Sequence, residues 1–343
     1  MAMTTVPRDR EGQLIHRLAK IIPSAGLGGF GRGLRLGIGD DAAVLRHSPG
    51  AEIVLSCDAS LEGVHFHARN QPPESVGYKS LARATSDLAA MGAFPTYFLL
   101  TLALPNEKTG NWLDRFAQGM ARAARAFHIR LIGGDISRAS AVTISITVLG
   151  TAAPGKIVLR SGARPGDLIC VSGELGKAQL GLELVLRGFS SNPRLKPLLE
   201  PHFFPRIRLK LGQWLAARRV ASAMMDLSDG LSMDLPRLCQ ASGTGAKLFE
   251  EKIPKVTIPP ALSGQNLLPL ELALHGGEDY ELLFTVPPRL VKHLRRAPGR
   301  VPLKMIGEIT KRREILLIGA NGVASKLPAL GWDHFRTWQN KRK

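Results

Sequence analysis

The sequence predicts a two-domain α/β protein in which each half mixes strands and helices. The chain has 343 residues, more than one typical domain contains. Hydrophobic residues make up 44% of it, which is enough for two buried cores and argues against a disordered chain. A turn-rich break at Ala152-Ala153-Pro154-Gly155 separates the halves. We therefore expect an N-terminal domain at residues 1–150 and a C-terminal domain at residues 151–343.

In the N-terminal half, prolines and glycines mark where helices begin and end. Pro23 ends a short amphipathic helix, and Pro72-Pro73 opens a second helix that ends at Gly92. Short apolar runs between such breaks predict strands, and the clearest extends from Tyr97 to Leu104. The expected order is a helix at 11–22, strands at 34–45 and 53–57, a helix at 74–91, a strand at 97–104, a helix at 111–127, and strands at 129–132 and 142–149.

The C-terminal half has a similar mixture. The apolar run Asp167-Leu-Ile-Cys-Val-Ser172 predicts a strand, and Leu231, Leu235 and Leu238 mark the buried side of a helix. The proline-rich stretch at 190–205 favours a surface loop. The expected order is a strand at 167–172, a helix at 176–187, that loop, a helix at 205–219, a strand at 221–225, the leucine-bearing helix, a strand at 282–286, a helix near 289–295, and strands at 305–309 and 315–318.

The chain is strongly basic, with 46 Lys and Arg against 28 Asp and Glu and a formal net charge of +18. Such a charge suits either a nucleic-acid binder or a solvated surface that attracts small anions. The basic pairs are dispersed along the chain, none is interleaved with aromatic residues, and only Lys341-Arg342-Lys343 forms a cluster. We therefore favour small anionic partners over nucleic acid.

Cysteine usage and apolar runs bear on the cellular compartment. Cys57, Cys170 and Cys239 are odd in number and widely spaced, which predicts neither a disulfide framework nor a zinc site. The N-terminus carries charge where a signal peptide has an apolar segment, and the longest apolar run is too short to span a bilayer. We expect a soluble, cytoplasmic protein with no membrane partner.

Many of the carboxylates gather in short motifs beside glycines, at the ends of apolar runs. Oxygen ligands suit hard divalent cations, and Mg²⁺ in particular is usually shared between carboxylates and substrate phosphates. Together the motifs therefore predict a site for several metal ions and a phosphate compound. They are Gly39-Asp40-Asp41, Cys57-Asp58 with Glu62, Ser86-Asp87, Gly134-Asp135, Asp226-Leu-Ser-Asp229-Gly230 with Asp234, and Gly277-Glu278-Asp279.

Each motif alone has a structural alternative. Asp87 lies four residues after Arg83 on an expected helix, so the two side chains could form an ion pair. Asp229 could cap the N-terminus of the helix that follows it. The segment at 276–281 could be a charged hairpin turn. A calcium-binding EF-hand is excluded, because its twelfth position would be Arg237 rather than glutamate.

Common nucleotide-binding motifs are missing from the sequence. The segment at 173–178 has neither the length nor the hydroxyl of a P-loop, and no protein-kinase pair of H-R-D and D-F-G motifs occurs. The glycine-rich stretch at 26–31 follows no expected strand and opens no helix, so it predicts a flexible loop rather than a dinucleotide site. Phosphoryl chemistry would therefore use another architecture.

The motifs continue in unbroken order through seven segments. These are Gly-Ile-Gly-Asp-Asp-Ala-Ala-Val at 37–44, Ser-Cys-Asp-Ala-Ser-Leu-Glu-Gly-Val-His-Phe at 56–66, Ser-Asp-Leu-Ala-Ala-Met-Gly-Ala at 86–93, Ile-Gly-Gly-Asp at 132–135, Arg-Ser-Gly-Ala-Arg-Pro-Gly-Asp at 160–167, Asp-Leu-Ser-Asp-Gly-Leu at 226–231 and Gly-Gly-Glu-Asp-Tyr-Glu-Leu at 276–282. This order resembles the thiamine-monophosphate kinase family, part of the aminoimidazole-ribonucleotide-synthase-like superfamily of ATP users. The resemblance implies a two-domain α/β (α+β) fold whose N-terminal sheet forms a homodimer interface.

The resemblance also implies residue roles. It places metal ions on Asp41, Ser56, Cys57, Asp58, Asp87, Asp135, Asp226 and Asp229. It places ATP on Gly134, Asp135, Arg160 and Ser228, and thiamine monophosphate on His65, Glu278 and Trp332, with Phe335 as a nearby alternative to the tryptophan. The implied cofactors are several Mg²⁺ ions, ATP is the co-substrate, and no catalytic side chain is expected beyond the metal cluster. The N-terminal domain would bind metal and ATP, and the C-terminal domain would complete the site.

Two positions depart from the family pattern. Residue 57 is Cys where the family usually has Thr, and Ile136 replaces the Thr that usually follows Gly-Gly-Asp. If residue 57 binds metal through its carbonyl, the change is harmless. If the family uses the hydroxyl, a hard-metal ligand is lost in this chain.

The implied acceptor is a phosphate monoester, whose second pKa of about 6 leaves it largely deprotonated at neutral pH. Such a nucleophile needs no general base, so position and charge would suffice for direct in-line transfer assisted by several Mg²⁺ ions. Two alternatives remain: another ATP-using enzyme of the superfamily, either a cyclase or an activating protein, and a basic nucleic-acid-binding protein. Salt-dependent DNA binding without ATP turnover would favour the last.

Overall fold

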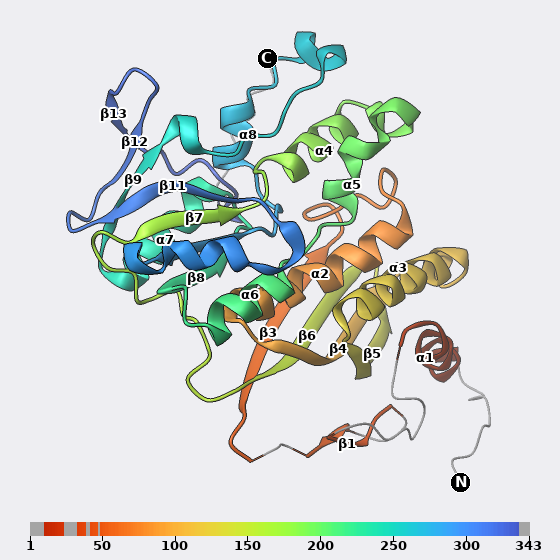
Figure 1. Ribbon diagram of the computed structural model, residues 1–343. Helices are drawn as coiled ribbons and strands as arrows, with labels where there is room; N and C mark the ends of the chain where they lie inside the picture. The colour runs from red at the N-terminus through yellow and green to blue at the C-terminus, as the bar shows by residue number, and fades with distance from the viewer. Residues whose placement is uncertain (1–9, 24–32, 39–41, 47–48, 336–343) are drawn as a thin grey trace. The chain divides into compact units, whose positions relative to one another are not determined.

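The computed structural model describes residues 10–23, 33–38, 42–46 and 49–335 (Figure 1). The chain forms two compact units, one of Met1–Val158 with Phe203–Arg219 and one of Leu159–His202 with Val220–Lys343. The chain leaves the first unit after Val158 and returns to it at Phe203–Arg219. Within the described residues, no helix combines the length and the apolarity needed to cross a membrane.

The first unit is built on a four-stranded sheet. Its central strands β6 and β4 pair in antiparallel fashion, β3 joins β6 in antiparallel fashion, and β5 joins β4 in parallel. The strand order is therefore not the chain order. In spatial order the strands are β3 (Glu52–Leu61), β6 (Thr143–Ala152), β4 (Phe94–Leu104) and β5 (Arg130–Arg138).

Helices α2 (Pro73–Met91) and α3 (Asn111–Phe127) lie on the same face of this sheet (Figure 1). Two glycines let them approach closely: a Cβ at Gly77 would lie 2.0 Å from the Phe116 carbonyl oxygen, and one at Gly119 would lie 1.9 Å from that of Glu74. Helix α1 (Arg10–Ile21) packs against α3 and β5, and α6 (Leu209–Ala217) packs against α2. Apolar side chains between helices and sheet form the core.

The second unit contains a seven-stranded sheet in which all neighbours are antiparallel except β12 and β9. Its core includes Ile169, Val171, Leu235 and Leu283. In spatial order the strands are β13 (Ala324–Lys326), β12 (Ile315–Ile318), β9 (Gly245–Phe249), β11 (Leu303–Thr310), β7 (Leu168–Ser172), β10 (Leu282–Val286) and β8 (Ala223–Asp226). Its α-helices include α4 (Lys177–Leu186), α7 (Leu231–Ser242) and α8 (Pro269–His275).

Most expected elements are confirmed, and several end differently. The expected strand at 34–45 is two short strands, β1 (Leu34–Leu36) and β2 (Val44–Leu45), which pair with each other. The helix expected near 289–295 is a 3₁₀ helix, η6 (Pro288–Arg296). Strands β9 and β13 and helix α8 were not expected. The other 3₁₀ helices are η1 (Asn106–Lys108), η2 (Phe189–Ser191), η3 (Pro193–Leu195), η4 (Glu250–Lys252), η5 (Pro260–Gln265) and η7 (Pro298–Arg300).

The surface loop expected at 190–205 is wrong, because most of it is helical and includes α5 (Lys196–Phe203). Leu195, Leu199 and Phe203 are buried at a spacing of four residues, which is the spacing of one helix face. Pro197 falls in the first turn, where proline costs no hydrogen bond, whereas Pro201 lies inside the helix and lacks the N–H that would donate there. The apolar spacing therefore outweighs the prolines.

Candidate active site

In the first unit, an acidic cluster forms where β3 faces α2. Successive side chains of a strand point to opposite faces, so Ser56 and Asp58 share one face of β3. On that face the Ser56 hydroxyl donates a hydrogen bond to the carboxylate of Asp87, which α2 carries. One helical turn earlier, the Arg83 guanidinium lies 3.5 Å from the Asp58 carboxylate. Arg83, four residues before Asp87 on α2, therefore has an acidic partner on β3, Asp58.

Cys57 points to the opposite, exposed face of the sheet. Its Sγ lies 3.5 Å from the Ser145 hydroxyl oxygen and 3.4 Å from that of Thr147, both on the neighbouring strand β6. The thiol is therefore turned away from Ser56, Asp58 and Asp87. A contribution of residue 57 to that cluster would have to come from its backbone.

Asp135 lies apart from this cluster within one chain. Strands β3 and β5 are the two edges of the sheet, so Asp58 and Asp135 are separated by three strand spacings, about 14 Å. Asp135 pairs in register with Thr101, which pairs with Ser145, and these residues lie on the exposed face. Gly134 precedes it at a φ of +151°, where a Cβ would lie 1.8 Å from the Leu100 carbonyl oxygen. Only glycine fits there.

Two further predicted positions belong to the first unit. Asp41 lies outside the described residues. His65 follows the end of β3, where its Nδ1 accepts a hydrogen bond from the Leu61 N–H at 3.0 Å. Glu62, from the same motif, accepts a hydrogen bond from the Val142 N–H at 2.9 Å, which gives it a structural role.

In the second unit, two of the predicted motifs lie side by side. The Tyr280 N–H donates to the Leu227 carbonyl at 2.9 Å, and the Glu278 N–H donates to the Ser228 carbonyl at 2.8 Å. These bonds extend the pairing of β8 with β10 beyond its last register pair, Asp226 and Leu282. The acidic loop after β8 and the acidic segment before β10 therefore form one surface. The charged hairpin turn considered for 276–281 does not describe this arrangement.

Trp332 and Glu278 border that surface. The Trp332 N–H donates to the Asp229 carbonyl at 3.0 Å. Glu278 has a φ of +67°, which is uncommon for a residue with a side chain, and its carboxylate lies 3.5 Å from Nδ1 of the buried His202. Phe335 is 96% exposed. Of the two aromatic candidates, the structure places Trp332 beside the acidic loop.

Arg237 is a functional candidate that the sequence reasoning missed, and Asp234, although part of a predicted acidic motif, was given no role of its own. Asp234, fully buried in the first turn of α7, accepts hydrogen bonds from the N–H groups of Ser228 and Asp229 at 3.1 and 3.0 Å. Arg237 bridges Asp229 and Asp234 at 2.5 and 2.7 Å. Burial raises the pKa of Asp234 to about 6, and the Asp229 carboxylate adds to this rise. The aspartate–arginine spacing of three residues could have indicated the pair.

Asp229 is not the N-cap of α7, because the helix begins after Gly230, which caps it without a side-chain hydrogen bond. Asp279 serves a different helix: its carboxylate accepts hydrogen bonds from the N–H groups of Gly176 and Ala178, at 2.6 and 3.1 Å, at the start of α4. Burial raises the pKa of Asp279 to about 7, against the opposing effect of these two donors.

Arg160 lies beside the C-terminal end of α7, whereas Asp229 precedes the N-terminal end of that helix. Its carbonyl accepts a hydrogen bond from the Ser242 hydroxyl at 3.2 Å, and the preceding Leu159 carbonyl accepts one from the Met224 N–H at 2.9 Å. The Arg160 side chain is exposed. The structure therefore places this predicted ATP contact on the second unit, alongside β8.

The described donors suit a hard divalent cation. Ser56, Asp58 and Asp87 offer oxygen atoms in the first unit, and Asp226 and Asp229 offer them in the second. No group of three or more His, Cys, Asp or Glu residues converges on a metal position in the described part of the chain. Mg²⁺ takes several of its ligands from water and substrate phosphates, so these smaller donor sets fit it.

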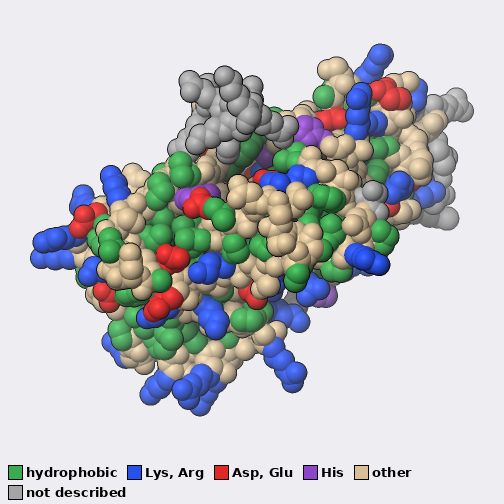
Figure 2. Space-filling model, turned by 90° about the horizontal axis from the view of Figure 1, so that it is seen from above, with side chains coloured by type: hydrophobic (Ala, Val, Ile, Leu, Met, Phe, Trp, Pro, Cys, Tyr) green, Lys and Arg blue, Asp and Glu red, His purple; other side chains and the backbone are tan. Residues whose placement is uncertain are grey.

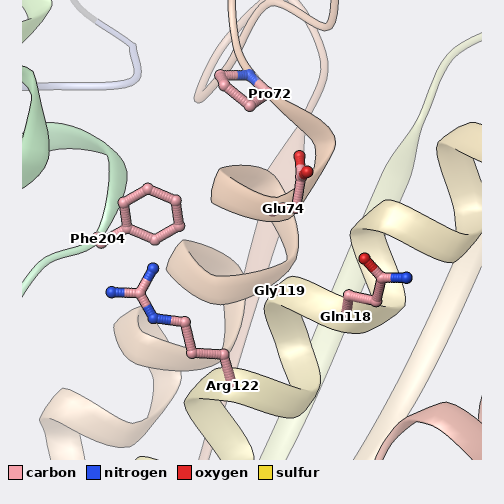
Figure 3. A pocket seen from close by; sticks show the side chains of 6 residues that line it. All are labelled: Pro72, Glu74, Gln118, Gly119, Arg122 and Phe204. Atoms are coloured by element: carbon pink, nitrogen blue, oxygen red, sulfur yellow. The ribbon is translucent and has the colours of Figure 1, made fainter. Parts of the chain in front are cut away.

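A separate cavity of about 390 Å³ opens on the first unit (Figure 3). None of the described site residues lines it. Within the cavity the Arg122 guanidinium lies 4.4 Å from the centre of the Phe204 ring. The residues that line the cavity are Pro72, Glu74, Gln118, Gly119, Arg122 and Phe204.

The basic residues form no single patch on the visible surface. In Figure 2, Lys and Arg side chains are spread over that surface.

The sequence of the chain matches two protein-family models and is similar to known proteins. Residues 39–152 match the family described as AIR synthase related protein, N-terminal domain, and residues 164–319 match its C-terminal domain. The thiamine-monophosphate kinase of Synechococcus elongatus is 34% identical over 305 residues, covering 87% of this chain and 91% of the relative.

Solved structures agree with this likeness. A crystal structure of thiamine-monophosphate kinase from Stenotrophomonas maltophilia superposes with a TM-score of 0.76 at 34% identity, covering 85% of this chain and 92% of that one. A structure of AaThiL complexed with AMPPCP and TMP superposes with a TM-score of 0.75 at 32% identity, covering 84% and 89%.

Proposed function

Because the chain belongs to the thiamine-monophosphate kinase family of AIR synthase related proteins, we propose that it phosphorylates thiamine monophosphate with ATP to give thiamine diphosphate. The observation that carries this proposal is the junction of two motifs in the second unit. There Ser228 and Asp229, the expected contacts of ATP and metal, lie beside Glu278 and Trp332, the expected contacts of the acceptor. The relative complexed with AMPPCP and TMP supports the same pair of substrates.

In each unit, carboxylate or hydroxyl oxygens would hold Mg²⁺ ions. When bound, they would neutralise the charge of the phosphates that must meet. The residues proposed to hold them are Asp41, Ser56, Asp58, Asp87, Asp135, Asp226 and Asp229, with residue 57 contributing through its backbone.

The protein's own contribution is position. Gly134, Arg160 and Ser228 would bind ATP, and His65, Glu278 and Trp332 would bind the acceptor. The acceptor phosphate has a second pKa of about 6, so it attacks without a general base. With both phosphates held in this way, a direct in-line transfer between them would need only position and charge.

We propose that a homodimer forms through the exposed face and edges of the first unit's sheet. Ile53 and Leu55 on this face are 53% and 62% exposed, and Phe94 and Leu99 are also exposed there. Apolar exposure of this kind is typical of an interface. A dimer that joins β3 of one copy to β5 of the other would bring Asp135 of the partner subunit toward Asp58, which one chain keeps apart.

A reducing cytoplasm suits the chain, because Cys57, Cys170 and Cys239 are all free thiols. The dispersed basic surface gives no reason to prefer nucleic acid as the partner. Another ATP-using reaction of the superfamily would require a different acceptor in place of thiamine monophosphate.

One assay tests the proposal. Purified protein is incubated with ATP and thiamine monophosphate, with and without Mg²⁺, and thiamine diphosphate is measured by chromatography. We expect product only with metal, loss of product with EDTA, and recovery with Mg²⁺ or Mn²⁺. Full activity in metal-free buffer would contradict the metal assignment. ATP turnover without thiamine diphosphate would contradict the acceptor.

A further inference from the structure

We propose that Asp234 is a positioning residue for the reaction, acting together with Arg237 to fix the loop that carries Ser228 and Asp229. This inference rests on the proposed function, since it takes Ser228 as an ATP contact and Asp229 as a metal ligand. Neither Asp234 nor Arg237 is expected to touch substrate. Their effect would pass through the two residues before α7.

Asp234 holds the backbone of the loop that carries Ser228 and Asp229. A single oxygen of Asp234, Oδ2, accepts the N–H groups of two consecutive residues, Ser228 at 3.1 Å and Asp229 at 3.0 Å. Asp234 sits in the first turn of α7, whose buried side chains fix its position, and its own side chain has no solvent exposure. A buried carboxylate that accepts two backbone donors ties the loop to the helix rather than to solvent. The loop is thereby held where its side chains emerge.

Arg237 orients the carboxylate of Asp229. The second oxygen of Asp234, Oδ1, lies 2.7 Å from Arg237, and the same Arg237 nitrogen lies 2.5 Å from Oδ2 of Asp229. Within the described contacts, Arg237 engages one carboxylate oxygen of Asp229 and leaves the other for a cation. A metal ligand is oriented in this way when an outer partner holds its far atom.

The positioning role of Asp234 can be distinguished from ordinary packing by comparison with another buried aspartate. Asp167 is a second buried aspartate of the same unit, and it also accepts a backbone N–H, that of Arg164 at 3.0 Å, together with the Ser222 hydroxyl at 2.6 Å. Its partners carry no predicted role in the reaction. Asp167 therefore provides a matched control for the loss of a buried carboxylate brace.

The test compares Asp234→Ala, Asp234→Asn and Asp167→Ala. Mn²⁺ binding is measured by titration in the presence of AMPPCP, with thermal unfolding and steady-state kinetics alongside. For Asp234→Ala we expect Mn²⁺ affinity to fall at least about tenfold and the KM for ATP to rise, with the KM for thiamine monophosphate within about twofold. Asp234→Asn keeps an acceptor for the N–H groups and loses the ion pair with Arg237. Its Mn²⁺ affinity should therefore lie between that of the unmodified protein and that of Asp234→Ala.

Asp167→Ala should lower the unfolding midpoint comparably and leave Mn²⁺ affinity unchanged. A combined variant, Asp234→Ala with Asp229→Asn, shows whether Asp234 acts through Asp229. If it does, the loss of Mn²⁺ binding free energy in the combined variant should be far smaller than the sum of the losses in the two single variants. Unchanged Mn²⁺ affinity in Asp234→Ala, equal losses in the Asp167 control, or full additivity would overturn the inference. Failure of the unmodified protein to bind Mn²⁺ with AMPPCP would instead overturn the proposed function, whatever the variants do.

Discussion

The backbone N–H of Trp332 donates a hydrogen bond to the carbonyl oxygen of Asp229 at 3.0 Å. The glycine before the tryptophan makes this approach possible, because a Cβ at Gly331 would lie 2.2 Å from the same oxygen. A segment more than a hundred residues away in sequence thus brings an aromatic ring to the acidic loop. This relationship makes the contribution of the ring testable.

Trp332→Ala should weaken binding of thiamine monophosphate and leave that of ATP nearly unchanged. A cationic thiazolium resting on the indole face gains about 0.5–2 kcal/mol, which corresponds to a rise in KM of about 2- to 30-fold. Initial rates against each substrate measure the two constants. Phe335→Ala is the control, because its ring is almost fully exposed, and it should change neither constant. A rise in the KM for ATP would place the indole elsewhere.

Cys57→Thr should change activity and Mg²⁺ dependence little. The thiol lies on the exposed sheet face near Ser145 and Thr147, so a threonine hydroxyl would also point away from Asp87. Ser56→Ala provides the contrast, since it removes the hydroxyl that contacts Asp87 and should raise the Mg²⁺ concentration needed for half-maximal rate. A large gain in Mg²⁺ affinity in Cys57→Thr would show that a side-chain oxygen at this position reaches the metal.

The sequence was most informative where breaks and apolar runs coincide. Helix α3 and strands β10 and β12 have the bounds that their residues predict. Helix α5 was hidden because its prolines dominate local propensity, whereas the burial of Leu195, Leu199 and Phe203 depends on the rest of the fold.

The candidate site, too, could be predicted only in part from the sequence. Acidic motifs could be found from composition and glycine spacing, but spatial strand order could not. The sheet therefore separates Asp58 from Asp135 although both belong to the predicted cluster. The role of Asp234 depends on which backbone N–H groups point at it, and no pattern of side chains along the chain reveals that.

Asp279 should make folding stability depend on pH. Burial raises its pKa from an ordinary 3.8 to about 7, so the folded state holds a proton that the unfolded state has lost. Stability contributed by this group is therefore greatest below the unfolded pKa and falls as pH rises through the folded pKa. Unfolding midpoints of the protein and of Asp279→Asn, measured from pH 4 to pH 8, should show a decline in the first that the variant lacks. Parallel curves would contradict the assignment.

His202 should govern acceptor binding through Glu278. His202 is only 1% exposed, and its Nδ1 lies 3.5 Å from the Glu278 carboxylate, whose backbone occupies the uncommon φ of +67°. A carboxylate held from behind by a buried ring keeps one orientation toward a ligand. His202→Phe fills a similar volume without the nitrogens, so it should raise the KM for thiamine monophosphate and leave the KM for ATP and the unfolding midpoint nearly unchanged.

The comparison variant is Glu278→Gln, which keeps the shape of the side chain and removes its charge. If His202 acts through Glu278, the two single variants should raise the same constant, and the double variant should be little worse than Glu278→Gln alone. An equal rise in both Michaelis constants in His202→Phe would indicate a general disturbance of helix α5 instead. Circular dichroism at the assay temperature separates that outcome from a specific effect, because loss of α5 would lower the helical signal.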